Sequence, residues 1–396
     1  MTTFSFPSIN IKEGAARLQI PDMAQYRVPT EAPVFYNFLM ELNRDIATLV
    51  IKAYQELQGH PLTILLPMAA TGVRGIRFRL ELPNIERLIM NDVSPLAYEL
   101  MTRNLELNDL TDHIELRNDD AISVLNSFAK RGQRVDVIDI DPFGSPSRFI
   151  DSAIRALKKK TGMICLTATD MAPLCGVTPQ ACLRKYGGRP LRTEYCHELA
   201  IRLCLNTLIT TAARYEIAIT PIFCYSIDHY IRIYALLQSG ALKADAVLEQ
   251  IGYIVHCLQC NHRFSTKNLL FAASKCPICQ AYQLDYAGPV WLGELFDSSF
   301  CKKLHRENQQ RQLRSKKQIE NMLQFVLEEV GGPLTYHNIH RLCKEHKISA
   351  PPMKWLIEIL RQKGFFASRT HFSRISIRTD ALRHKIAQII QSYNKN

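Results

Sequence analysis

The sequence lacks several features that mark membrane, secreted or repetitive proteins. It has no run of about 18 consecutive apolar residues, so no membrane-spanning helix is expected. Residues 1–21 lack a positively charged start followed by an apolar stretch, so no secretory signal is expected. Long internal repeats and low-complexity tracts are also absent. We therefore expect a cytoplasmic protein that does not bind membranes, and no feature of the sequence requires a protein partner.

The composition is that of an ordinary globular protein. Hydrophobic residues make up 47% of the 396 residues and charged residues 22%, which excludes a largely disordered chain. This length allows two or three domains and a large core.

Charge is distributed unevenly along the chain. Residues 1–300 contain 30 basic and 30 acidic side chains, whereas residues 301–396 contain 19 basic and 7 acidic ones. A concentrated basic segment indicates a polyanionic partner, most often a nucleic acid. The alternative is a basic face that only keeps the protein in solution.

Four of the twelve cysteines form two closely spaced pairs, Cys257-x2-Cys260 and Cys276-x2-Cys279. This spacing predicts a tetrahedral zinc site with no open position, and hence a structural metal. The neighbouring His256 and His262 are interpreted as bystanders, and the spacing disfavours an iron–sulfur cluster. The other eight cysteines lie mostly among apolar residues and are expected to be reduced core residues.

Strands and helices alternate between residues 62 and 169. Strand patterns at 62–68, 87–92, 113–120, 134–144 and 163–170 are each followed by a helical pattern or a turn, as at Ser94-Pro95, where Ser94 is the expected N-cap. This alternation predicts a parallel, doubly wound α/β sheet of the Rossmann type. A helix over 194–214 precedes two strand patterns that would form an antiparallel pair at one edge, and the sheet pattern ends near Ser239-Gly240.

The basic C-terminal quarter begins with a polar stretch at 302–317. Three helices are expected at 318–332, at 335–346 with Thr335 as cap, and at 350–364, followed by a hairpin over 365–381. This order is typical of a winged helix-turn-helix, an α+β fold. A small helical domain that binds only protein is the alternative. Basic residues on the third helix and the hairpin favour nucleic acid; they are Lys354, Arg361, Lys363, Arg369, Arg374 and Arg378.

A turn of small residues, 69–75 (AATGVRG), lies between the first strand and its helix. It is neither GxGxxG nor a P-loop, so a nucleotide without a buried pyrophosphate fits better, and S-adenosylmethionine has this character. Asp92, at the end of the next strand, can accept both ribose hydroxyls. Asp120, or its neighbour Asp119, can accept from the adenine amino group at the third strand end. The alternative is an ordinary strand–helix turn.

The fourth strand ends in residues 139–146 (DIDPFGSP). An exocyclic amine on a nucleobase is a poor nucleophile, because its lone pair is delocalised into the ring. It needs hydrogen-bond acceptors and a ring that stacks on the base. Asp141, the Pro142 carbonyl and Phe143 offer these groups, whereas Asp139, two residues earlier on the same face, is expected to be supporting. The alternative is a tight turn without chemistry.

The sequence resembles the tRNA guanine-26 N2-dimethyltransferases over essentially its whole length. The shared motifs are residues 13–21, 34–37, 40–45, 69–75, 91–97, 138–146, 167–176, 183–187, 192–198, 225–232 and 368–373. The resemblance implies a Rossmann-like methyltransferase domain over 1–245, a zinc module over 246–300 and a winged-helix-like tRNA-binding domain over 301–396. One departure is Phe38, where the family pattern has proline.

The resemblance also implies a reaction and its residues. The expected reaction transfers two methyl groups from S-adenosylmethionine to the N2 amine of guanine 26 in tRNA. The implied cofactor residues are Arg44, Thr71, Gly72, Arg74, Asp92, Asp120 and Ala121. The implied base-binding and catalytic residues are Asp141, Pro142, Phe143 and Phe35. Two rivals are an amine methyltransferase acting at another position and a non-catalytic RNA-binding protein with a zinc knuckle and a winged helix.

Overall fold

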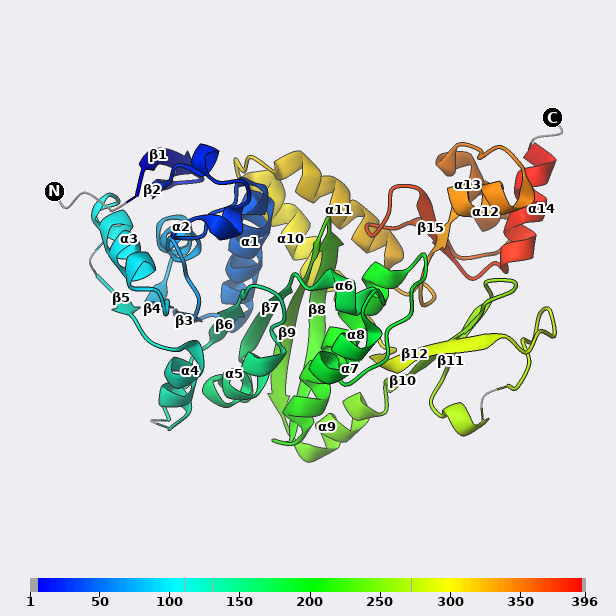
Figure 1. The fold of residues 1–396 in the computed structure, drawn as a ribbon, viewed down its shortest axis with the longest axis horizontal. Coiled ribbons are helices and arrows are strands. Elements are labelled where there is room, and N and C mark those ends of the chain that lie inside the picture. The colour runs from blue at the N-terminus through cyan, green and yellow to red at the C-terminus, as the bar shows by residue number, and fades with distance from the viewer. Residues whose placement is uncertain (1–5, 111, 131, 272, 394–396) are drawn as a thin grey trace.

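A mixed sheet of seven strands forms the centre of the molecule (Figure 1). The computed structural model describes residues 6–110, 112–130, 132–271 and 273–393. The strand order is β5-β4-β3-β6-β7-β9-β8, with β3 to β7 parallel and β9 antiparallel to both β7 and β8. The strands are β3 (Leu62–Leu66), β4 (Ile85–Asn91), β5 (Ile114–Arg117), β6 (Val137–Ile140), β7 (Met163–Ala168), β8 (Ile217–Ile227) and β9 (Tyr230–Ser239). The predicted parallel sheet and its antiparallel edge pair are both confirmed.

Two groups of helices cover the two faces of the sheet (Figure 1). The first group is α1 (Glu41–Gln58), α2 (Val73–Glu81) and α3 (Pro95–Glu106), and the second is α4 (Ala121–Lys130), α5 (Ile150–Ala156) and α8 (Cys196–Ala213). Ser94 caps α3 as expected, whereas α5 ends well before the expected Gly162. None of the helices in the described ranges has the length and apolarity that a membrane span needs.

Several short elements connect these layers. A hairpin of β1 (Ser8–Glu13) and β2 (Ala16–Pro21), which sequence patterning did not indicate, precedes α1. Helices α6 (Met171–Leu174) and α7 (Pro179–Tyr186) lie between β7 and α8. Single 3-10 turns occur at Met23–Gln25, Pro29–Glu31, Phe38–Met40, Ser147–Phe149 and Leu269–Phe271.

A second, three-stranded sheet follows α9 (Ala241–Leu248). It consists of β10 (Ile251–Cys257), β11 (Arg263–Thr266) and β12 (Leu284–Trp291), in the order β11-β10-β12. The four paired cysteines lie at or beyond the end of β10 and before β12, within the predicted zinc module. Helix α8 contacts β12 and so joins this sheet to the main one.

The C-terminal segment combines helices with a small sheet. It contains α10 (Ser298–Gln310), α11 (Lys316–Glu329), β13 (His337–Asn338), α12 (Ile339–His346), α13 (Met353–Gln362), β14 (Ala367–Arg369), β15 (Ser376–Thr379) and α14 (Arg383–Tyr393). The small sheet has the order β13-β15-β14. Asn338, not the expected Thr335, caps α12, because Thr335 adopts a left-handed conformation before β13. Helix α14 was not expected.

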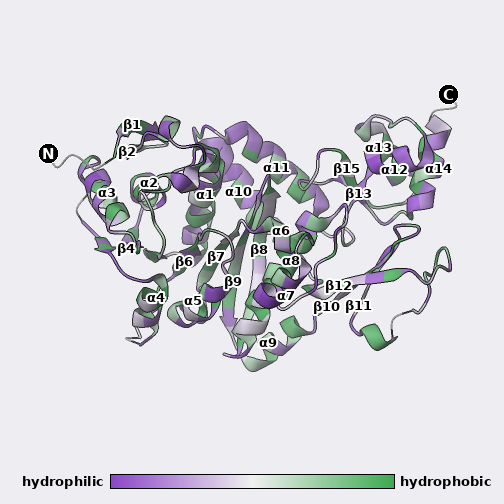
Figure 2. Ribbon diagram, viewed as in Figure 1, coloured by the Kyte–Doolittle hydropathy of each residue, from purple (hydrophilic) through white to green (hydrophobic). Residues whose placement is uncertain are grey.

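The hydrophobic core divides at a different point from the expected domain boundary. The main cluster extends from the sheet into α10 and α11 through Phe300, Leu304 and Leu323, and α10 also contacts α1. A separate cluster lies within residues 339–390. The expected division at residue 301 therefore falls inside the main core. In Figure 2 the helices carry both hydrophilic and hydrophobic residues, as expected for helices with one face on a core.

A buried network of charges joins β15 to helices α8 and α11. The Arg378 guanidinium lies 2.8 Å from Glu198 of α8 and 2.7 Å from Glu329 of α11, and Arg202 also pairs with Glu198 at 2.8 Å. Burial alone would raise the pKa of Glu198, but Arg378 and Arg202 lower it to about 2. Arg378 is 3% exposed, so its expected place on a nucleic-acid surface is wrong.

Replacing Arg378 with an apolar residue should destabilise the whole protein. Arg378→Met leaves two buried carboxylates without their shared partner, and we expect the free energy of unfolding to fall by about 3–5 kcal/mol. Urea denaturation followed by circular dichroism measures the change. Arg374→Met, at an exposed arginine on the same hairpin, is the control and should change stability by less than about 0.5 kcal/mol. Equal stability of the two variants would contradict a structural role for the network.

Candidate active site

The turn between β3 and α2 lies at the carboxyl edge of the main sheet. Ala70 and Gly72 both have positive φ, at 48° and 78°, and Gly72 begins α2. A Cβ at Gly72 would lie 3.1 Å from Met101 of α3, so this position favours glycine. The Ala70 N–H donates to Asp92 Oδ2 at 2.9 Å, which ties the turn to the end of β4. Thr71, Gly72 and Asp92 are therefore neighbours, as their places at adjacent strand ends predicted.

Asp120 marks the third strand end and begins α4. Its Oδ1 accepts from the N–H groups of Ile122 and Ser123 at 2.9 and 3.0 Å, which caps the helix. The next residue, Ala121, is buried, whereas Asp119 and Asp120 are both exposed. Asp119 accepts from the Asp120 N–H at 2.7 Å. Asp120 caps α4 and Asp119 does not, but both carboxylates are exposed and could contact a ligand at this edge of the sheet.

Asp141 follows β6 and is held by an arginine from α2. Arg74 Nη2 donates to Asp141 Oδ2 at 2.5 Å and to Asn43 Oδ1 of α1 at 2.9 Å. The Asp141 side chain is 24% exposed and that of Arg74 10%, so one carboxylate faces the site from a largely buried support. The structure thus brings together Arg74, expected at the cofactor, and Asp141, expected at the base.

Asp139 lies beneath this pair. Arg232 of β9 donates to both Asp139 oxygens at 2.8 and 2.6 Å and to Thr167 of β7 at 2.7 Å, and Arg74 Nη1 lies 3.6 Å from Asp139. Burial alone raises the pKa of Asp139, but Arg232 and Arg74 lower it overall. Asp139 is 2% exposed, which fits the expected supporting position. Sequence reasoning gave Arg232 no role, although a charged residue within an apolar strand pattern signals a buried partner.

Two aromatic rings meet beside Asp141. Phe35 and Phe143 have ring centroids 4.9 Å apart at an interplanar angle of 81°, and Phe143 is 68% exposed. The loop that holds Phe143 and buried Pro142 is fixed by Thr169, whose Oγ1 accepts from the Gly144 N–H at 2.8 Å. Phe38, the departure from the family pattern, lies against Tyr36 and leaves the contact of Phe35 intact. A half-buried and an exposed aromatic ring beside a carboxylate can together hold a planar ring.

Arg44 of α1 binds the N-terminal hairpin. Its guanidinium donates to both oxygens of Glu13, at 2.7 and 2.5 Å, and to the Asn37 carbonyl at 3.1 Å. Tyr36 also donates to Glu13, at 2.6 Å. Burial raises the pKa of Glu13, but Arg44 lowers it to about 2. In these contacts Arg44 fixes the segment that carries Phe35, and sequence reasoning did not identify Glu13.

Three buried polar atoms around the turn lack a hydrogen-bond partner within the described residues. They are Asn43 Nδ2, Thr71 Oγ1 and Arg74 Nη1. Buried polar atoms without partners are uncommon, and a polar ligand is one explanation. All three can donate a hydrogen bond, which suits a carboxylate-bearing ligand, and Asp92 adds an acceptor for hydroxyl groups. These residues fit the amino-acid tail and ribose of S-adenosylmethionine.

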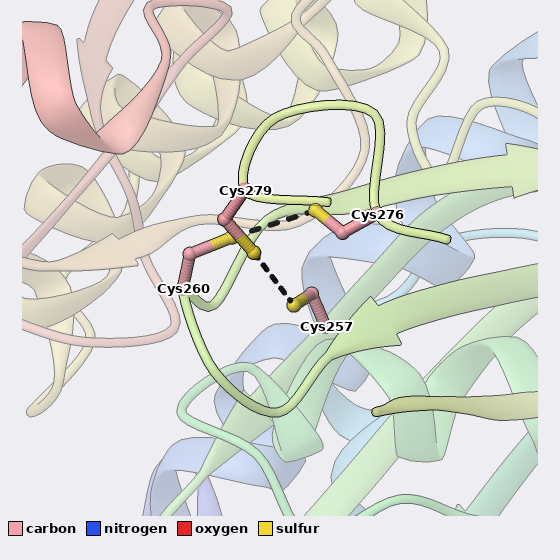
Figure 3. A group of neighbouring side chains, drawn as sticks. All are labelled: Cys257, Cys260, Cys276 and Cys279. Atoms are coloured by element: carbon pink, nitrogen blue, oxygen red, sulfur yellow. Dashed lines mark hydrogen bonds between the residues drawn. The ribbon is translucent and has the colours of Figure 1, made fainter. Parts of the chain in front are cut away.

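The four paired cysteines converge in the second sheet (Figure 3). Their sulfurs lie within 4.8 Å of one another, with Cys257–Cys279 and Cys260–Cys276 both at 3.6 Å. A tetrahedral zinc ion with Zn–S bonds of about 2.3 Å places sulfurs about 3.8 Å apart. The cluster therefore fits zinc. His256 lies outside it, because its Nδ1 is 3.1 Å from the Tyr195 hydroxyl, and His262 stacks on Phe264.

Comparison with known proteins places this site in a family. Residues 14–391 match the model of the N2,N2-dimethylguanosine tRNA methyltransferases. A relative from Methanosphaera stadtmanae, named tRNA (guanine(26)-N(2))-dimethyltransferase, is 37% identical over 96% of this chain and 96% of its own. One from Aquifex aeolicus, named tRNA (guanine(26)-N(2)/guanine(27)-N(2))-dimethyltransferase, is 36% identical over 93% of this chain and 92% of its own.

A solved structure agrees with the sequence matches. It is described as Trm1 from Pyrococcus horikoshii in complex with S-adenosyl-L-methionine. The TM-score is 0.84 at 36% sequence identity, and the match covers 96% of this chain and 99% of that one. Both sequence and fold therefore agree over nearly the full length, and the chain belongs to the N2,N2-dimethylguanosine tRNA methyltransferase family.

Proposed function

We propose that this protein transfers two methyl groups from S-adenosylmethionine to the N2 amine of guanine 26 in tRNA, giving N2,N2-dimethylguanosine. The observation that supports it most directly is the pair formed by half-buried Phe35 and exposed Phe143 beside the Asp141 carboxylate. This arrangement offers stacking surfaces and a hydrogen-bond acceptor to one flat base with an exocyclic amine. Membership of the family supports the position and the product. The protein acts in the cytoplasm.

The guanine amine must be made nucleophilic before it can be methylated. Asp141 accepts an N–H of the amine, aided by the Pro142 carbonyl, and so lets the nitrogen lone pair leave conjugation with the ring. Phe35 and Phe143 hold the base in place. S-adenosylmethionine supplies an electrophilic methyl group on its sulfonium. Asp141 is also placed to take the proton that the nitrogen loses after transfer, so the reaction needs no covalent enzyme intermediate.

The support beneath Asp141 orients its carboxylate. Arg74 directs one carboxylate oxygen through the 2.5 Å hydrogen bond, Asp139 offsets the charge of Arg74, and Arg232 pairs with Asp139 in turn. Because these groups are largely buried, their geometry is fixed before substrate arrives. Within the described residues, Arg74 Nη1 makes no hydrogen bond. Arg74 can therefore bind the cofactor through Nη1 while Nη2 holds Asp141 beside the base.

The residues after strands β3, β4 and β5 would form the cofactor site. Asp92 would hold the ribose hydroxyls and Asp120 the adenine amino group, with Ala121 leaving room beside the ring. Thr71 and Gly72 form the turn against the ligand, and Arg74 would bind the amino-acid tail. Arg44 belongs to this set as the residue that anchors the chain next to Phe35, through its ion pair with Glu13.

The C-terminal part would bind tRNA. We propose three units, residues 1–245, 246–300 and 301–396, in which the last contains a winged-helix-like fold. The order of α11, β13, α12, α13 and the β14–β15 hairpin supports this. Of the six basic residues expected to face a nucleic acid, four are exposed: Lys354, Arg361, Lys363 and Arg374. They would bind phosphates, while guanine 26 leaves the tRNA core to reach the aromatic pair.

Methyl transfer to defined transcripts tests the reaction and its position. Labelled S-adenosylmethionine is supplied with an unmodified tRNA transcript or with one in which guanine 26 is replaced, and the nucleosides are analysed by mass spectrometry. We expect dimethylguanosine only with the first transcript. Product that persists after replacement would move the target, for example to guanine 27. Transcript binding without any product would favour a non-catalytic RNA-binding protein.

A variant of the acceptor distinguishes catalysis from binding in the same assay. Asp141→Asn should lower the rate by at least about 10²-fold, because the charged acceptor is lost, while tRNA affinity changes little. Asp245→Asn, at an exposed aspartate in α9, is the control and should keep full activity. Retained turnover in Asp141→Asn would refute the acceptor role.

The salt dependence of tRNA binding tests the C-terminal surface. Replacing Lys354, Lys363 and Arg374 together by alanine should weaken binding and reduce the slope of log affinity against log salt by roughly 2, since each phosphate contact contributes about 0.7–0.9. The control replaces Lys159, Lys160 and Lys243. These lysines are exposed in the segment before β7 and in α9, outside the C-terminal segment. Equal slopes in the two triple variants would exclude this surface as the phosphate-binding one.

Metal analysis of purified protein tests the four-cysteine module. Cys276→Ser should lower the zinc content by one equivalent per chain, because a four-ligand structural site loses a ligand and its metal. Its melting temperature should fall as well. Leu258→Ala, at an exposed side chain between two of the cysteines, is the control and should retain the metal. Unchanged zinc content in Cys276→Ser would rule out the assignment.

A further inference from the structure

A second cluster of metal-binding side chains lies outside both sites described above. The cysteine sulfurs of Cys175 and Cys196 and a ring nitrogen of His197 lie within 4.8 Å of one another, and all three residues are half-buried. Among the described residues, only the four-cysteine module and this cluster bring together three or more potential ligand atoms of His, Cys, Asp or Glu in this way. The proposed methyl transfer uses none of the three.

The backbone holds these side chains together. Cys175 ends α6, where its N–H donates to the Met171 carbonyl at 2.7 Å, and Cys196 is the first residue of α8. Between them, Gly176 has a φ of 82°, and a Cβ there would lie 2.8 Å from the Arg192 nitrogen. Close contact between the two backbone segments therefore sets the distance between Cys175 and Cys196. A position at the start of a long helix also favours a thiolate at Cys196.

We propose that Cys175, Cys196 and His197 bind one zinc ion, separate from the ion of the four-cysteine module. Thiolate and imidazole are ligands that zinc prefers, and two thiolates neutralise its charge in a half-buried place. A tetrahedral ion with Zn–S bonds of about 2.3 Å and a Zn–N bond of about 2.0 Å needs ligand atoms about 3.5–3.8 Å apart. The observed cluster reaches this with small side-chain rotations.

Three protein ligands leave a fourth position for water or another small ligand. This distinguishes the site from the closed module at Cys257, and it predicts weaker and more exchangeable metal. The ion would join α6 to the start of α8. Helix α6 directly follows Thr169, which exchanges two hydrogen bonds with Gly144, at 2.8 and 3.0 Å. Bound metal would therefore steady the segment that holds the Phe143 loop.

Cobalt titration of the full-length, metal-depleted protein under reducing conditions tests this site. Wild type should bind two equivalents of Co²⁺ with thiolate-to-metal absorption, and Cys196→Ala and Cys175→Ala should each bind one. Cys182→Ala is the control, because Cys182 is a buried cysteine of α7 outside the cluster, and it should bind two. Cys276→Ser should lose the other equivalent, so the two sites are counted independently of methyl transfer.

The outcomes separate clearly. A single equivalent in wild type, lost in Cys276→Ser and unaffected by Cys196→Ala, would overturn the proposal. A disulfide between Cys175 and Cys196 in freshly purified protein, found by peptide mapping in place of the second metal, would overturn it too. Circular dichroism checks that each variant is folded. If an alanine variant is not, His197→Gln, which removes only the imidazole ligand, should lower binding to one equivalent with native secondary structure.

Discussion

The active site depends on one alternating row of buried charges, in which Asp141, Arg74, Asp139 and Arg232 follow one another from the surface into the sheet. The members come from three elements: Asp139 and Asp141 from β6 and its end, Arg74 from α2 and Arg232 from β9. A charge this far from water is stable only beside its opposite. The row therefore couples the Asp141 carboxylate to the correct assembly of the sheet, and it explains why an arginine lies in the middle of the otherwise apolar strand β9.

The aromatic pair depends on the same principle at a second place. Phe35 lies on a segment without regular hydrogen-bonded structure, and a loop of this kind needs anchors to hold a ring in position. Glu13, Arg44 and Tyr36 provide them through buried, charged hydrogen bonds. Thr169 does the same for the loop of Phe143. The Phe143 ring is thus exposed and the Phe35 ring half-buried, while Glu13, Arg44 and Tyr36 are buried.

Sequence reasoning identified the parts of the site that are local in the chain. Asp141, Pro142 and Phe143 form one motif, and Asp92 and Asp120 follow recognisable strands, so their common edge could be predicted. Glu13 and Arg232 could not, because each acts through partners far away in the sequence. The extension of the main core past the predicted boundary at 301 could not be predicted either, for a related reason. The stretch 302–317 is strongly polar, so its sequence does not indicate that a few apolar residues of α10, such as Leu304, pack into the main core.

Arg378 was misread because a sequence does not reveal whether a basic residue faces water or carboxylates. Because Arg378 is buried between Glu198 and Glu329, its ion pairs form a rigid connection between the hairpin that contains β15 and helices α8 and α11. A tRNA held by the C-terminal surface would then meet the aromatic pair at a set distance. The enzyme would then select the nucleotide to be modified by its distance, within the folded RNA, from the part that the C-terminal surface binds. The identity of the bases around the target would not matter.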